Sequence, residues 1–111
     1  MRKVLVSVAM ASILTISLVA SAAIWSGWGP IEQIRESSAG ALVSGQFLTI
    51  NPAGCSDASW GRLDQTLTST EIDRINKILL SALLSGRDVS VLVDNTSCEG
   101  TYIKIVGARI K

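Results

Sequence analysis

The two cysteines of this chain, Cys55 and Cys98, constrain its possible folds more than any other feature of the sequence. They lie 43 residues apart, and both follow an N-terminal segment typical of exported proteins. Paired cysteines in an oxidising compartment are typical of a disulfide. The sequence contains no histidine and no Cys-x-x-Cys motif, so neither a metal site nor a redox thiol is indicated. We therefore predict one disulfide, Cys55–Cys98, which ties two distant turns together.

The first 22 residues have the pattern of a secretory signal peptide. Arg2 and Lys3 precede an apolar run over residues 4–20, and Ala20-Ser21-Ala22 has the small-x-small pattern that signal peptidase reads. Hydroxyl side chains dilute the run, whereas a membrane-spanning helix needs about 20 apolar residues. We predict a signal peptide over 1–22, a single secreted domain over 23–111, a periplasmic or secreted location and no stable membrane insertion after cleavage. Retention of the segment as an anchor is the alternative.

The charge and length of the predicted mature domain exclude one large class of partners. Arg2 and Lys3 belong to the leader, so residues 23–111 keep eight Lys and Arg against nine Asp and Glu. A nucleic-acid-binding domain shows a basic excess, and we predict no nucleic-acid partner. A chain of this length forms one domain with a modest core, which a disulfide stabilises strongly.

The clearest local pattern predicts a helix between Thr68 and Gly86. Thr68 to Thr70 offer hydroxyl caps, Glu71 lies in the first turn where the helix dipole favours an acid, and Gly86 suits the C-cap. One apolar stripe would face the core at helical spacing. Its members are Ile72, Ile75, Leu79, Ala82 and Leu83.

Leu80 and Leu84 lie one helical turn apart, beyond the edge of that stripe. The simpler interpretation is a wide core-facing surface. The sharper interpretation is a second apolar seam that contacts a neighbouring subunit in a homo-oligomer. The sequence leaves both open.

The strand patterns predict an α+β fold, with a small bent antiparallel sheet, one packed helix and one disulfide. Residues 31–36 and 41–50 read as a hairpin, 51–65 as a loop, and 89–94 with 102–110 as a second hairpin whose turn carries Cys98. These are four strands, whereas an OB-like barrel has five. A fifth would come from residues 23–29 or 60–67, and whether the barrel closes or stays partly open depends on it.

The residues offer little chemistry for catalysis. Without histidine the usual nucleophilic triads are absent, and no metal-ligand set or phosphate-binding loop is present. We predict no catalytic, metal or cofactor-binding residue and no cofactor. The enzymatic alternative is an acidic loop in which Asp57 pairs with Asp64 or Glu99. Trp28 and Trp60 are candidate ligand aromatics, since aromatic rings stack on sugars, although aromatics in so small a domain are more often core.

The order of these elements resembles a broad group of small secreted, mostly uncharacterised proteobacterial proteins with one disulfide. The matching positions are Trp28, Asn51, Pro52, Gly54, Cys55, Leu79, Ala82, Gly86, Val89, Val91 and Cys98. The architecture also resembles the B subunits of pentameric AB-type toxins, which implies an OB-type domain, ring assembly and glycan binding. No carbohydrate-binding residue can be carried over from that likeness.

We therefore expect a secreted, disulfide-stabilised, non-enzymatic binding or assembly module. Its expected partners are a glycan or protein ligand and further copies of itself. The alternative is a small periplasmic enzyme or enzyme inhibitor that acts through the acidic loop.

Overall fold

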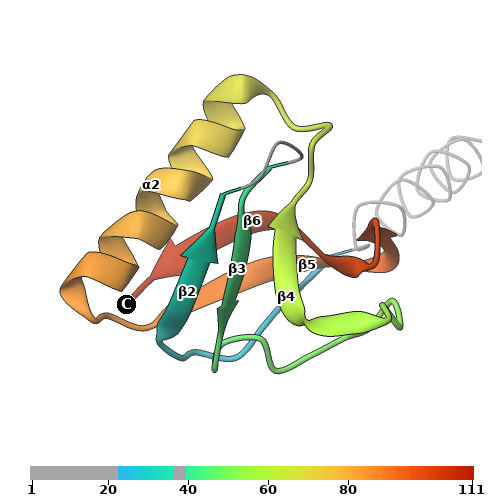
Figure 1. Ribbon diagram of the computed structural model, residues 1–111, viewed down its shortest axis with the longest axis horizontal. Coiled ribbons are helices and arrows are strands. Elements are labelled where there is room, and N and C mark those ends of the chain that lie inside the picture. The colour runs from blue at the N-terminus through green and yellow to red at the C-terminus, as the bar shows by residue number, and fades with distance from the viewer. Residues whose placement is uncertain (1–22, 37–39) are drawn as a thin grey trace, which may run out of the picture.

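A computed structural model describes residues 23–36 and 40–111 of the chain, and the predicted signal peptide lies outside this range. Figure 1 shows the helix of the described residues lying across a strongly bent sheet, which confirms the predicted α+β class. The elements are β1 (Ala23–Trp25), β2 (Ile31–Arg35), β3 (Leu42–Gly45), β4 (Asp57–Leu63), α2 (Ser69–Ser85), β5 (Val89–Glu99) and β6 (Tyr102–Ile110). Within the described ranges, no helix has the length and apolar character needed to span a membrane.

The six strands form one sheet in the order β1-β5-β6-β4-β3-β2, so two strands that are consecutive in the chain lie at its two ends. In a flat sheet those ends would be about 24 Å apart. Yet β1 and β2 are joined by residues 26–30 alone. Within this link, Gly29 forms an isolated β-bridge with Val89 of β5. The sheet must therefore curve back on itself, but β1 and β2 do not pair with each other, so it stays partly open, which decides the question of closure that the sequence left open.

One strand pair differs from the predicted antiparallel sheet. β4 runs parallel to β6, while the other neighbouring strands are antiparallel. A parallel pair needs a long crossover connection. Here α2 and β5 provide that connection, and the sheet is mixed.

Two buried serines fasten the link between β1 and β2 to the side of β5. The Ser26 hydroxyl accepts a hydrogen bond from the Val91 amide at 3.0 Å, and the Ser90 hydroxyl donates to the Ser26 carbonyl at 2.7 Å. Buried polar groups need such partners to avoid a desolvation cost. β1 and the link that follows it are therefore part of the sheet, at one of the two places from which a further strand was expected.

The helix forms as predicted. Thr68 and Glu71 make a reciprocal capping box at its start, and Gly86 ends it in the left-handed conformation. Hydrogen bonds from Thr68 hold the pKa of Glu71 below its usual value. Ile75, Leu79 and Ala82 are buried, so the predicted stripe does face the sheet, where α2 contacts β6 and β2.

The core fills the inside of the bent sheet. Alternate residues of β5 and β6 point inward, as predicted for the C-terminal strands. The most completely buried side chains include Val43, Phe47, Leu63, Leu79, Val89, Val91, Val93, Ile103 and Ile105. Phe47 is the aromatic residue of this core.

The region predicted to be a loop over residues 51–65 contains β4, so the loop prediction was wrong, and β4 overlaps the further strand that residues 60–67 were expected to offer. The inward position between Trp60 and Arg62 is Gly61 rather than a large apolar residue, which hides the alternation typical of a strand. A Cβ atom at Gly61 would lie 3.1 Å or less from carbon atoms of Ile105. The close approach of β6 explains why this strand carries a glycine on its inner face.

Two strand boundaries also differ from the prediction. β3 ends at Gly45 rather than continuing to residue 50, and Phe47 reaches the core from the turn that follows. β5 continues through Glu99, so Cys98 lies within a strand and the turn falls at Gly100 and Thr101. Most of the predicted turn between β2 and β3 lies outside the described residues.

Candidate functional site

The most distinctive surface lies on the outside of the sheet, where four strands place one row of residues in register. Arg35 of β2 pairs with Leu42 of β3, Leu42 with Arg62 of β4, and Arg62 with Lys104 of β6. Paired residues project from the same side of a sheet, and residues two positions along do so too. We call this surface the outer face and define it as Arg35, Leu42, Trp60, Arg62, Tyr102 and Lys104.

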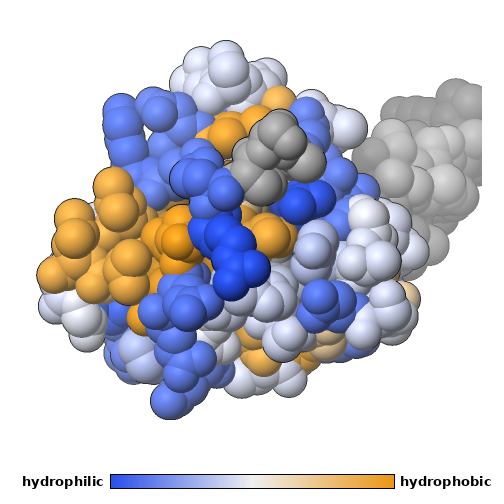
Figure 2. Space-filling view, in the orientation of Figure 1, coloured by the Kyte–Doolittle hydropathy of each residue, from blue (hydrophilic) through white to orange (hydrophobic). Residues whose placement is uncertain are grey.

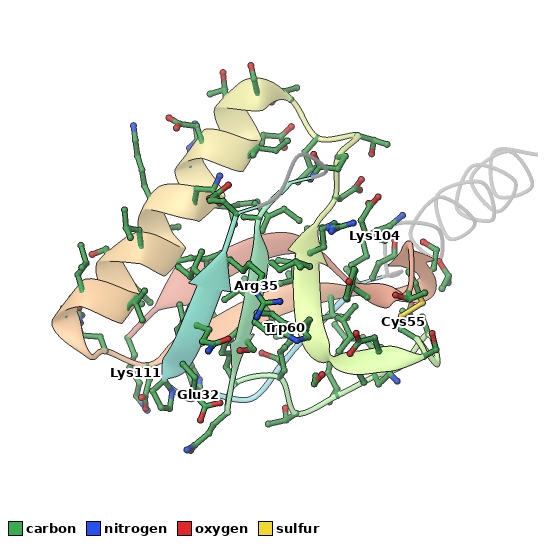
Figure 3. The ribbon with its side chains drawn as sticks, in the orientation of Figure 1. Glu32, Arg35, Cys55, Trp60, Lys104 and Lys111 are labelled. Atoms are coloured by element: carbon green, nitrogen blue, oxygen red, sulfur yellow. A yellow bond between two sulfur atoms is a disulfide. The ribbon has the colours of Figure 1, made fainter. Side chains whose placement is uncertain are left out.

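Each aromatic ring of the outer face has an arginine stacked on it. The guanidinium carbon of Arg35 lies 4.8 Å from the centre of the Trp60 ring, and that of Arg62 lies 4.7 Å from the Tyr102 ring. Arg35 and Trp60 come from β2 and β4, and they meet over β3, which lies between these strands (Figure 3). Such stacks contribute about 0.5–1 kcal/mol each when exposed, and they hold both side chains in fixed positions.

Leu42 forms the apolar floor of this face. Its side chain is only 6 % exposed, yet it is not a member of the buried core cluster on the inner side of the sheet. Its register partners Arg35 and Arg62 carry long aliphatic stems, which can cover an apolar neighbour while their charged ends reach water. The outer face therefore has an apolar base beneath a layer of arginine and aromatic side chains.

The outer face brings together three cations, Arg35, Arg62 and Lys104, while two acids, Asp57 and Glu99, border it as the register partners of Tyr102. Arg62 and Lys104 are direct neighbours on adjacent strands, an arrangement that normally destabilises a sheet. Among the described residues neither forms an ion pair, and the Arg62 Nε atom is buried without a hydrogen-bond partner. Lys104 does interact with one acid, Asp94. Hydrogen bonds from the Thr96 and Ser97 amides lower the pKa of Asp94, and the positive charge of Lys104 lowers it by a smaller amount.

The disulfide fixes the end of β4 that leads to Trp60. Cys55 and Cys98 are bonded as predicted, with Cα atoms 5.8 Å apart. The Asn51 side chain accepts a hydrogen bond from the Cys55 amide at 2.8 Å and donates one to the Cys55 carbonyl at 2.9 Å. The Asn-Pro-x-Gly-Cys turn therefore holds Cys55 in place, and the bond anchors the start of β4 to β5.

A second group of aromatic residues surrounds Arg109, near the C-terminal end of β6. Its guanidinium carbon lies 4.2 Å from the Trp25 ring centre and 4.7 Å from that of Trp28, and Lys111 lies 5.5 Å from Trp28. Both tryptophans are 39 % exposed. We call Trp25, Trp28, Arg109 and Lys111 the N-terminal stack. The expectation that such aromatics are core was therefore wrong for all three tryptophans.

The edge of the helix formed by Leu80 and Leu84 is open to solvent. Leu80 is 50 % and Leu84 is 79 % exposed, so the simpler interpretation of a wide core-facing surface was wrong. They line an open groove of about 430 Å³ together with Lys77, Ser81 and Ser85. Figure 2 shows the resulting apolar patch over the C-terminal half of α2, while strongly hydrophilic residues cross the centre of the view.

The acidic loop does not bring Asp57 and Asp64 together, and Asp57 and Glu99 lie on opposite sides of their common register partner Tyr102. Asp57 and Asp64 lie at opposite ends of β4. Asp57 accepts a hydrogen bond from the Ser59 hydroxyl, Asp64 accepts from the amide and hydroxyl of Thr66, and Glu99 accepts from the Gln65 amide. In the part of the chain that the structure describes, no group of three His, Cys, Asp or Glu side chains could hold a metal.

The structure thus separates the two predicted ligand aromatics. Trp60 belongs to the outer face and Trp28 to the N-terminal stack, and neither lies with Leu80 and Leu84 on the helix. The sequence analysis missed Arg35, Arg62 and Lys104. Outward positions two residues apart, Trp60-x-Arg62 and Tyr102-x-Lys104, are the signal that could have found them.

Comparison with known proteins adds no family to this description. No protein-family model matches the chain, and no curated protein matches it. The function must therefore be argued from the surface itself.

Proposed function

We propose that this protein is a secreted, non-enzymatic binding module whose outer face contacts a polar ligand through stacked aromatic and arginine side chains. One observation carries the proposal: the tryptophans and the tyrosine of this small domain lie outside the core, and each has a cationic side chain stacked on it. Tryptophan and arginine are the residues that contribute most at binding surfaces.

The position of the outer face on the sheet favours it over the N-terminal stack. Its residues come from β2, β3, β4 and β6, and β3, β4 and β6 are paired on both sides, whereas β2, which carries Arg35, is an edge strand. The N-terminal stack depends on β1, a strand of three residues at the edge of the sheet. Sites on well-supported strands keep their geometry better than sites on short or mobile elements. A saccharide suits the outer face, because sugars offer apolar ring faces for Trp60 and hydroxyl groups for arginine.

The substitution Trp60→Ala is expected to weaken ligand binding by at least about tenfold while leaving the fold intact. The loss follows from removal of the ring that stacks on the ligand and of the contact that positions Arg35. Protein purified after export would be screened on a glycan array, and the affinity for the strongest ligand measured by titration calorimetry. An array without any bound glycan would contradict the saccharide assignment.

Trp28→Ala provides the matched control, because it removes the same side chain from the N-terminal stack. It is expected to leave the affinity unchanged. If Trp28→Ala abolishes binding and Trp60→Ala does not, the ligand contacts the N-terminal stack and the outer face is not the site.

A second function, self-assembly, is supported by the exposure of Leu80 and Leu84. Two large apolar side chains one turn apart in an open groove are typical of a helix that contacts a neighbouring subunit. We propose that the helices of neighbouring copies meet along this edge. Assembly and ligand binding are compatible, because the edge lies on α2 and the outer face lies on the sheet.

The substitution Leu84→Glu is expected to dissociate the assembly while changing the free energy of unfolding by no more than about 0.5 kcal/mol, since the side chain is exposed. Light scattering would give the oligomeric state, and urea denaturation the stability. Thr70→Glu adds the same charge at the other end of the helix and should leave assembly intact. A monomeric wild-type protein would contradict the assembly proposal.

A further inference from the structure

We infer that Arg62 and Lys104 form an anion-binding subsite on the outer face, and that the ligand is an acidic saccharide whose carboxylate or sulfate group lies between these two side chains. This inference rests on the proposed function, because it specifies the chemistry of a ligand bound at that face.

The first argument is the arrangement of the two cations. Arg62 and Lys104 are register partners on neighbouring strands, so their side chains leave the same side of the sheet about 4.8 Å apart. Like charges at directly opposite positions destabilise a sheet. No described acid forms an ion pair with either residue, and Arg35 adds a third positive charge to the same row. An anion bound between them would remove this repulsion.

The second argument is the state of the Arg62 guanidinium. Its plane stacks on Tyr102, and its Nε atom is buried without a hydrogen-bond partner. A stacked guanidinium is already ordered, so little side-chain entropy is lost when it binds an oxyanion through two parallel hydrogen bonds. Because this Nε atom is shielded from solvent, an oxyanion would be bound by the terminal amino groups of the guanidinium instead.

The third argument concerns the rest of the ligand. Trp60 lies two residues before Arg62 on β4 and projects from the same face, so an aromatic ring flanks the subsite. A sugar ring could stack there while its acidic group reaches Arg62. Nucleic acid fits less well, because the eight Lys and Arg of residues 23–111 are outnumbered by nine Asp and Glu and cannot follow a phosphate backbone.

The test uses oligogalacturonate and its methyl ester, which share one sugar backbone and differ only in charge. The full exported protein is expected to bind the acid at least about tenfold more tightly than the ester. Raising the salt concentration from about 50 to 500 mM should weaken binding of the acid and not of the ester. The substitutions Arg62→Met and Lys104→Met should each lower the affinity for the acid about tenfold, with the apolar stem over Leu42 retained. Arg74→Met, the same change on the exposed helix surface, should have no effect.

The outcomes separate this inference from the proposed function. If acid and ester bind equally and Trp60→Ala weakens both, the anion subsite is wrong and the binding module stands. If the protein binds only neutral glycans on the array, the anion subsite is again wrong and the binding module again stands. If inorganic sulfate or an oligothymidylate binds as tightly as oligogalacturonate, the site does not select an acidic saccharide. If nothing binds on the array or in solution, the inference and the proposed saccharide ligand both fail.

Discussion

Replacing Cys55 and Cys98 together by serine is expected to lower the free energy of unfolding by about 4 kcal/mol, the value that chain entropy gives for a loop closed over this separation. The closed loop contains β4 and the whole of α2, so the bond restricts a large part of the unfolded chain. Cys55 also belongs to the buried core cluster, where a serine hydroxyl would add a desolvation cost. For a domain of this size the loss approaches the total stability.

Urea denaturation of the wild-type protein with and without dithiothreitol, beside the double serine variant, measures this effect. The reduced wild-type protein should also unfold at a low urea concentration, slightly above that of the variant because it keeps a thiol rather than a hydroxyl in the core. The variant itself should not respond to dithiothreitol, which controls for effects of the reductant on anything but the disulfide. A wild-type midpoint that is the same with and without reductant would show that the bond contributes little to stability.

The same double variant should also weaken ligand binding under conditions in which it is still folded. Cys55 lies two residues before β4, and the bond holds the start of that strand against β5. Without it, the segment that leads to Trp60 would be restrained only by the Asn51 hydrogen bonds and its neighbours in the sheet. The disulfide therefore links the stability of the domain to the geometry of the outer face.

The elements predictable from the sequence are those whose signals are local. The capping box of Thr68 and Glu71, the stripe through Ile75 and Leu79, and Gly86 all lie within one helix, and the structure confirms each of them. The disulfide was predictable by a different route, because a chain with two cysteines allows one intramolecular pairing. Neither prediction needed knowledge of which strands are neighbours.

The pairs Trp60-x-Arg62 and Tyr102-x-Lys104 are visible in the sequence, but their meeting on one outer face was not predictable, because it depends on pairing between distant strands. β4 carries Gly61 at an inward position, so it lacks the alternation that identifies a strand. Even with β4 assigned, its parallel pairing with β6 brings Arg62 beside Lys104 only after α2 and β5 have been placed. Charge repulsion between two such residues has no signature in the sequence.

Exposure of the tryptophans was missed for a related reason. Large aromatic residues bury much apolar area, and a small domain is expected to use them in its core. Here Phe47 and the branched aliphatic residues of β5 and β6 already fill the inside of the bent sheet. The tryptophans are placed outside, where arginine side chains from other strands of the sheet cover part of each ring.

The curvature of the sheet depends on close packing at Gly45, so Gly45→Ala is expected to destabilise the protein by about 3 kcal/mol. A Cβ atom there would overlap the carbonyl oxygen of Pro30 and lie 2.9 Å from Cε1 of Phe47 and 3.0 Å from the Cα atom of Ile31. Two of these neighbours are backbone atoms at the start of β2, which cannot move without shifting that strand. Relief of the overlap would separate β2 from β3 and carry Arg35 away from Trp60.

Gly54→Ala is the matched control, since nothing lies within 4 Å of its Cβ position and its φ of +69° makes the cost purely conformational. That cost should be about 1 kcal/mol, with ligand affinity unchanged once the variant is folded. Urea denaturation and calorimetric titration of both variants separate packing from backbone strain. If Gly45→Ala and Gly54→Ala lower the free energy of unfolding equally, β2 can move away from β3 at little cost. Gly45 would then not maintain the bend that brings Arg35 over β3.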